Sequence, residues 1–291
     1  MPDQNMLPIL TEAAQIPGLF KEIYGDLAKP GVTQVGQALS TILGLGNTLL
    51  WPIQILNERA KLALSDNLDK YRIELANVSA DDITAVSPEL GVPISERLAY
   101  VTDDQLSQLY VNLLAKASTV QTAHLAHPSF VNIINNLSPD EALLLKELHT
   151  APAVPFVSAA AFKKDGSEEY LILAEILTGL EDVVPISFPE NIVAYFSNFE
   201  GLGLVSIRRE THIANASLYQ GLEDRYRLGC AETLKELYRV KFKQELPDEL
   251  FVITFRRGNI VMTSFGKLFT DACIGPIKAR ETTDNINLPK S

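Results

Sequence analysis

Apolar residues recur at alternating spacings of three and four along much of the first half of the chain, and this period predicts helices. The longest such stretch is 53–78, whose other faces carry charged side chains, so we expect one long amphipathic helix there. A second apolar stripe runs along 106–117, and helices are also expected at 5–27 and 33–50. The chain is therefore predicted to be helical up to about residue 136.

Two helix starts carry capping signals. The hydroxyl of Thr102 can accept from a first-turn amide, and Gln105 three residues later completes a capping box. Ser138 is followed by Pro139, whose missing N–H costs nothing at the first helical position, and Glu141 can close a second box. We therefore predict N-caps at Thr102 and Ser138.

The pattern changes beyond the second of these starts. Asp165-Gly166 separates two apolar runs that can form a hairpin, although the second run also fits a helix. Further on, the sequence predicts a helix at 189–202, a strand at 204–209, and two strands within 251–262 joined by a tight turn at 257–259. A helix followed by strand, turn and strand is typical of a winged-helix-like unit, with 189–202 in the recognition position and 251–262 in the wing.

The predicted fold is mainly α, of the α+β class, in two domains. Residues 1–136 are expected to form a helical N-terminal domain, and residues 137–277 a winged-helix-like α+β domain. The polar residues 278–291 are expected to be a flexible tail.

Charge and cysteine content narrow the possible environments. The net charge is −11, and the predicted recognition helix contains no lysine or arginine, so the composition does not favour a nucleic-acid partner. Two cysteines, Cys230 and Cys273, give no disulfide framework, which fits a reducing compartment. The start of the chain lacks the charged and apolar regions of a secretory signal. We therefore expect a cytoplasmic protein.

One segment complicates this expectation. Residues 30–57 contain no charged side chain, and their number would be enough to span a bilayer. However, glutamine, asparagine, serine, threonine and proline residues interrupt the apolar run. Two alternatives stay open: a buried helical hairpin, or membrane contact through residues such as Leu43, Leu49 and Trp51, since tryptophan favours the membrane interface.

No pattern of catalytic or ligand-binding residues stands out. His124 and His127 have a spacing found in zinc sites, but no matching ligand cluster follows them. The glycines of 31–38 have P-loop spacing, but Gln37 stands where the phosphate-binding lysine is required. We therefore predict a protein that is not an enzyme and has no cofactor, metal site or small-molecule substrate.

Basic residues gather in two arginine doublets, Arg208-Arg209 and Arg256-Arg257. If the strand at 204–209 pairs with the wing, the two doublets lie close together. They could then contact a phosphate group or an acidic partner. The alternative, a solvated face that balances nearby carboxylates, stays open.

The order of several segments resembles the abortive infection alpha family of bacterial proteins. The resemblance extends over roughly residues 30–275, and its most specific parts are YVNLLAKAS, HPSFVNIINNLSPDEALLLKEL, FSNFEGLGLV and MTSFGKLFTDAC. The family name implies phage defence in which the infected cell stops growing or dies before phage release. The resemblance supplies no catalytic residues.

We therefore expect a non-enzymatic phage-defence protein that acts through protein contacts, including self-association, or through membrane perturbation. The alternative is a winged-helix-type regulator or sensor that binds nucleic acid.

Overall fold

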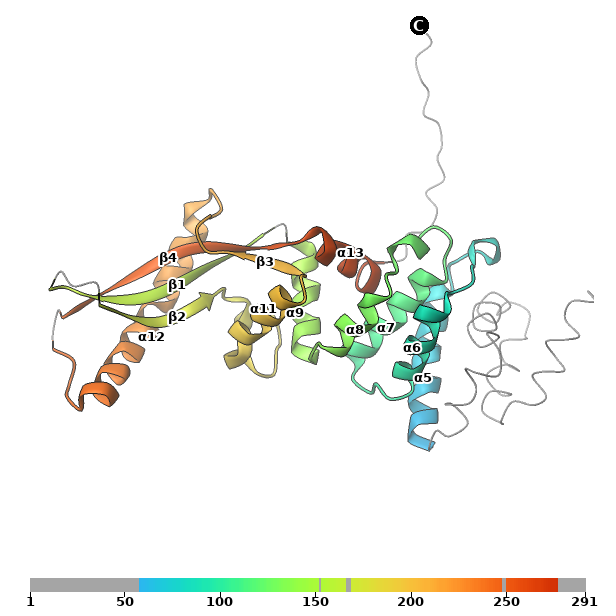
Figure 1. The fold of residues 1–291 in the computed structure, drawn as a ribbon, viewed down its shortest axis with the longest axis horizontal. Helices are drawn as coiled ribbons and strands as arrows, with labels where there is room; N and C mark the ends of the chain where they lie inside the picture. Colours follow the sequence, from blue (N-terminus) through green and yellow to red (C-terminus); the bar gives the residue numbers. More distant parts are fainter. Residues whose placement is uncertain (1–57, 152, 166–168, 248–249, 277–291) are drawn as a thin grey trace, which may run out of the picture. The chain divides into compact units, whose positions relative to one another are not determined.

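The structure is a computed structural model that describes residues 58–151, 153–165, 169–247 and 250–276 (Figure 1). These residues form helices and one four-stranded antiparallel sheet, so the predicted α+β class is confirmed. The predicted helices at 5–27 and 33–50, the uncharged segment 30–57 and the tail 278–291 lie outside the described residues.

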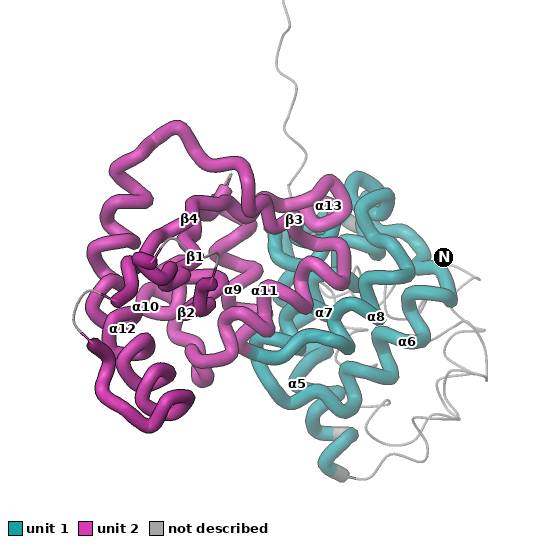
Figure 2. Tube along the Cα trace, turned by 60° about the vertical axis from the view of Figure 1, so that its left-hand side comes forward, with its two compact units in different colours: residues 1–139, 269–291 teal, residues 140–268 magenta. Residues whose placement is uncertain are grey.

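The chain divides into two compact units, residues 1–139 with 269–291 and residues 140–268 (Figure 2). The described part of the first unit is helical. Its elements before the second unit begins are α5 (Glu58–Leu75), η1 (Ala80–Asp82), α6 (Pro88–Leu98), α7 (Asp104–Ala117), η2 (Ala123–Leu125) and α8 (Ser129–Asn135). The apolar stripe predicted along the long amphipathic helix is its buried side, since Leu64, Leu68, Tyr71 and Leu75 are all buried.

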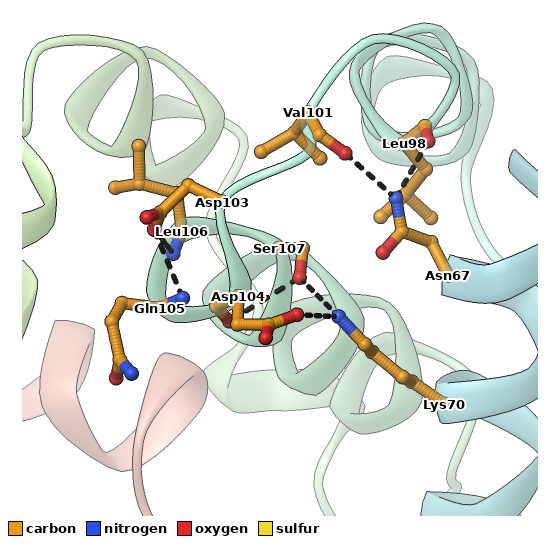
Figure 3. Close-up of polar contacts among 9 residues, drawn as sticks. All are labelled: Asn67, Lys70, Leu98, Val101, Asp103, Asp104, Gln105, Leu106 and Ser107. Atoms are coloured by element: carbon orange, nitrogen blue, oxygen red, sulfur yellow. Dashed lines mark hydrogen bonds and ion pairs between the residues drawn. The ribbon is translucent and has the colours of Figure 1, made fainter. Parts of the chain in front are cut away.

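The start of α7 differs from the prediction by one residue. Asp103, and not Thr102, is the N-cap, and its carboxylate accepts from the amides of Gln105 at 2.9 Å and Leu106 at 3.0 Å (Figure 3). A carboxylate caps as well as a hydroxyl does, and it also suits the positive end of the helix dipole. The predicted cap at Thr102 is therefore wrong.

Polar side chains of α5 tie it to the segment that leads into α7. Asn67 donates to the carbonyls of Leu98 at 2.8 Å and Val101 at 3.1 Å (Figure 3). One turn later, the ammonium of Lys70 donates to Asp104 and to Ser107, at 2.7 Å in both cases. These bonds fix the first helices of the unit to one another.

The second unit contains the sheet. Its elements are α9 (Pro139–Thr150), β1 (Val154–Lys163), β2 (Tyr170–Leu177), α10 (Leu180–Val183), η3 (Pro189–Asn191), α11 (Ile192–Gly201), β3 (Val205–Arg208), α12 (Ala216–Phe242), β4 (Phe251–Met262) and the start of α13 (Ser264–Cys273). The strands lie in the order β2-β1-β4-β3, and all neighbours are antiparallel. Helix α9 begins at Pro139 as predicted, and the run after Asp165-Gly166 is a strand paired with β1.

The predicted tight turn at Arg257-Gly258-Asn259 is wrong, because β4 is one continuous strand of 12 residues. Gly258 serves close packing here. A β-carbon at this position would lie 2.3 Å from Cζ of Phe156 and 2.7 Å from the carbonyl oxygen of Arg208. Since residues 251–262 form no hairpin, the winged-helix-like arrangement is not confirmed.

Helix α12 covers one face of the sheet and contacts β1, β2 and β4 (Figure 1). The hydroxyl of the fully buried Tyr219 donates to the carbonyl of Gly258 at 2.9 Å and accepts from the amide of Ile213 at 2.8 Å. Near the other end of the helix, the ring of Tyr238 contacts Phe251 edge-on at 6.2 Å. This face of the sheet is therefore a packed core.

Helix α11 and the segment before it are held by a buried carboxylate. Asp140 accepts from the amides of Ser187 at 2.8 Å and Phe188 at 2.9 Å, and from the hydroxyl of Tyr195 at 2.9 Å. Burial acts to raise the pKa of Asp140, but these hydrogen bonds outweigh it, and the pKa lies below its ordinary value. Helix α11 in turn contacts β3 and β2.

Candidate functional site: the open sheet face

On the sheet face opposite α12, no helix of the described residues packs over β2, β1 and the first half of β4 where they carry exposed side chains. Side chains alternate between the two faces of a strand, and directly paired residues share a face. Val154, Phe156, Ile207 and Ile260 belong to this second face and are buried. Beyond them lies a surface that we call the open face: Ser158, Ala160, Phe162, Tyr170, Ile172, Glu175, Val252, Thr254 and Arg256.

Strands β2 and β4 present large apolar side chains of the open face to solvent. Tyr170 is 55% exposed, Ile172 is 56% exposed and Val252 is 47% exposed. The register places Phe162 between Tyr170 and Val252, so these side chains are neighbours and not scattered. A contiguous apolar patch of this kind marks an interaction surface more often than single exposed residues do.

Two rings and a guanidinium group form the best-ordered part of this patch. The rings of Phe162 and Tyr170 are stacked with their centroids 5.5 Å apart and an angle of 26° between their planes. The guanidinium carbon of Arg256 lies 5.9 Å from the centroid of the Phe162 ring. The cation thus rests at the edge of an aromatic platform, which favours a fixed side-chain position.

Small side chains leave a hollow of about 240 Å³ in this surface. Ser158, Ala160 and Ala174 line it together with the two stacked rings. Glu175, Arg209 and Arg256 contribute charged groups to its lining. The open face therefore combines an apolar platform with two cations and one anion.

The comparisons with known proteins identify the family. Residues 61–273 match the abortive infection alpha family. This chain belongs to the abortive infection alpha family. A solved structure with some similarity is an uncharacterized protein from the hydrocarbon-degrading marine bacterium Alcanivorax borkumensis SK2, at 16% identity and a TM-score of 0.30. That match covers 52% of this chain and 92% of the other. The search of curated proteins gave no significant match.

The structure of this abortive infection alpha protein separates the arginines of the two predicted doublets. Strands β3 and β4 do pair, and Arg208 lies opposite Asn259 in the register. Arg209 and Arg256 line the hollow, whereas Arg257 faces α12 and donates to Glu223 at 2.8 Å. Successive residues of a strand point to opposite faces, so adjacent arginines of one strand cannot share a surface.

The aromatic and aliphatic residues of the open face were missed at the sequence level. The alternation along β2, whose residues read YLILAEIL, is hidden because apolar side chains stand on both faces of that strand. The sequence pattern therefore does not single out Tyr170 and Ile172 as surface residues. The signal that could have found them is the pairing with Phe162 and Ala160, which requires the register.

The histidine and cysteine residues noted in the sequence do not belong to the open face. His127 shares a 2.7 Å hydrogen bond with the hydroxyl of Ser129 at the start of α8. Burial raises the pKa of the Cys230 and Cys273 thiols, and neither contributes to the open face. Among the described residues, no group of three or more histidine, cysteine, aspartate or glutamate side chains is placed to hold a metal ion.

The predicted membrane residues Leu43, Leu49 and Trp51 lie outside the described residues. Within the part of the chain that the structure does describe, no helix has both the length and the apolar character needed to cross a bilayer.

Proposed function

We propose that this protein restricts phage by abortive infection and that it acts by binding, with the open face as its contact surface. Membership of the abortive infection alpha family supports the biological role. The observation that carries the binding mode is the cluster in which the exposed Tyr170, Ile172 and Arg256 surround the half-buried Phe162 on the sheet.

The composition of this cluster supports protein contact. Tyrosine and arginine are enriched among the residues that dominate binding energy at protein interfaces. A large apolar side chain gains roughly 1.5–3 kcal/mol when it moves from full exposure to full burial. Tyr170, Ile172 and Val252 are each about half exposed, so a partner that covered them would gain part of that amount from each. The proposal assigns no catalytic residue, and it places the protein in the cytoplasm.

A second version of the proposal concerns the membrane. The uncharged residues 30–57 could disturb a bilayer, and Trp51 would suit its interface. Leu43→Lys or Leu49→Lys would then oppose insertion by roughly 2.5–3.5 kcal/mol per charge at the bilayer centre. Loss of protection by folded variants, with the membrane potential spared, would support this version. Unfolding of the same variants would support burial of the segment.

The experiment compares phage infection of a susceptible bacterial host at low and high ratios of phage to cells. We expect wild-type protein to protect the culture at the low ratio, while infected cells stop growing or die at the high ratio without releasing phage. Individual survival of infected cells would contradict the abortive role.

Variants of the open face test the contact surface. Tyr170→Ser combined with Arg256→Glu should abolish protection while the protein stays folded. A matched control is Lys235→Glu combined with Lys241→Glu, since both lysines are exposed on α12 and neither lines the hollow. If the control protects and the open-face variant does not, the contact surface is supported. Full protection by the folded open-face variant would refute it.

A further inference from the structure

We propose that the partner of the open face is a second copy of this chain, bound face to face in a two-fold symmetric dimer. The inference rests on the proposed function, because it uses the same surface. The arrangement of charges and side-chain sizes across β2, β1 and β4 is what points to a second copy of the chain as the partner.

The strand order allows a simple symmetry. Strand β1 lies between β2 and β4 on the open face. Consider a two-fold axis that runs parallel to β1, midway between two facing sheets. The rotation leaves the height of each residue along the strand direction unchanged and moves the residue to the opposite side of the axis. Strand β2 of one copy then lies across from β4 of the other, and β1 lies across from itself. Facing sheets pack about 10 Å apart, which is close enough for their side chains to interlock.

The charges of the open face are complementary under this operation. Arg256 on β4 pairs with Ser158 on β1, and Glu175 lies near the same level on β2. The two-fold axis therefore places Glu175 of each copy opposite Arg256 of the other, with Arg209 also lining that hollow. Both symmetry-related contacts join opposite charges. A self-complementary surface of this kind is what an isologous dimer requires.

The apolar side chains match in the same way. At the level of the rings, Tyr170 of one copy lies opposite Val252 of the other, and Phe162 meets its own counterpart. At the next level, Ile172 lies opposite Thr254. Ser158 and Ala160 of β1 lie near the axis and face their own counterparts, and their small side chains, which line the hollow of about 240 Å³, let the two sheets approach closely.

The size of the surface predicts the strength of the dimer. The hollow is lined by ten residues. A standard stable interface uses about 20–30 residues on each side. We therefore expect a weak dimer that dissociates in the micromolar range, and whose formation depends on protein concentration and salt.

Sedimentation velocity of the full chain at increasing micromolar concentrations tests the dimer. The wild-type mass should rise from the 32.0 kDa of one chain toward twice that value. Glu175→Arg leaves the open face with cations only, and Arg209→Glu with Arg256→Glu leaves it with anions only. Each variant should stay monomeric by itself. An equimolar mixture of the two should dimerise again, because both opposed pairs are restored. Lys235→Glu with Lys241→Glu should behave as wild type.

Several results would overturn the dimer. A wild-type chain that is monomeric at all concentrations would do so, as would a dimer that the open-face variants leave intact. Failure of the mixture to dimerise would rule out the opposition of Glu175 to Arg256. The same chain is also titrated with a short oligothymidylate. A monomer that binds it and loses binding with Tyr170→Ala would assign the open face to single-stranded nucleic acid instead.

The infection assay separates this inference from the proposed function. If the chain is monomeric but the open-face variant loses protection, the dimer fails and the contact surface stands. If the chain dimerises as described and the variant still protects, the dimer stands and the proposed function fails.

Discussion

The two faces of the sheet hold neighbouring arginines in different surroundings. Arg257 faces α12, where its Nε donates to Glu223 at 2.8 Å and its guanidinium lies 5.4 Å from the centroid of the Tyr219 ring. Arg256, one residue before it, is exposed on the open face beside Phe162. Arg257 is thus paired inside the protein on the covered face, whereas the open face leaves Arg256 and the ring of Tyr170 exposed to solvent.

Side chains on the two faces therefore contribute to different processes, folding on the covered face and association on the open face. On the covered face, side chains gain burial and internal hydrogen bonds when the chain folds. On the open face, Tyr170, Ile172 and Val252 keep about half of their surface in water, so they contribute less to folding and can contribute to association. Substitutions on the covered face should therefore change unfolding, and substitutions on the open face should change binding.

The largest expected effect is that of Tyr219→Ala on the covered face. Tyr219 is fully buried and its hydroxyl makes two hydrogen bonds, so the substitution leaves a cavity and unpaired backbone groups. We expect a loss of about 3–5 kcal/mol in the free energy of unfolding, measured by urea denaturation. Tyr170→Ala is the matched control on the open face and should cost much less. Equal losses for the two tyrosines would contradict the distinction between the faces.

The next largest effect concerns the buried carboxylate of Asp140 in α9. Asp140→Ala removes the acceptor for the amides of Ser187 and Phe188 and for the hydroxyl of Tyr195. Hydrogen bonds to a charged group are worth about 1.5–3 kcal/mol, so a loss of about 2–3 kcal/mol in unfolding free energy is expected at neutral pH.

The same carboxylate predicts a pH dependence. The folded protein lowers the pKa of Asp140, because its hydrogen bonds outweigh the effect of burial. Its contribution is therefore complete above the unfolded pKa of about 4 and is lost as the pH falls through the lower folded value. Wild type should lose more stability than Asp140→Asn when the midpoint of thermal unfolding is followed from neutral to acidic pH. Parallel curves for the two proteins would count against this assignment.

Local features of the fold could be predicted from the sequence. The buried stripe along α5 and the start of α9 at Pro139 depend on side chains within one or two helical turns, and both were found. The prediction of a turn around Gly258 failed because the role of that glycine depends on Phe156, which lies about a hundred positions earlier in the chain. A glycine between two apolar runs has the same local pattern in a turn as in a closely packed strand.

The open face was only partly predictable for the same reason. The arginine doublets were visible as charge clusters, but which member points to which face depends on the register of β4 with β1. Phe162 and Tyr170 resemble core residues in the sequence. Their exposure follows from the packing of α12 against the other face, which no local pattern specifies.

A smaller effect is expected for Arg257→Gln. The substitution removes the ion pair with Glu223, but Arg257 is about one-third exposed, so solvent screens part of the interaction. We expect a loss of about 1 kcal/mol in unfolding free energy, and a double-mutant cycle with Glu223→Gln should recover most of it as a coupling energy. Arg256→Gln, the same change on the open face, should leave the free energy of unfolding unchanged and weaken only the dimer.

The smallest expected effect on folding is that of Val252→Thr, which changes one apolar side chain of the open face. Threonine keeps the branched shape that suits a strand, and its hydroxyl can be hydrated because Val252 is 47% exposed. The free energy of unfolding should change by less than about 0.5 kcal/mol. Val157→Thr is the matched control, since Val157 is fully buried on the covered face of β1 opposite Arg257. There the hydroxyl enters an apolar core, and a loss of about 1–3 kcal/mol is expected. Urea denaturation of both variants measures the difference directly. A large loss for Val252→Thr would mean that folding itself covers this face, and the open face could then not be free to bind a second chain.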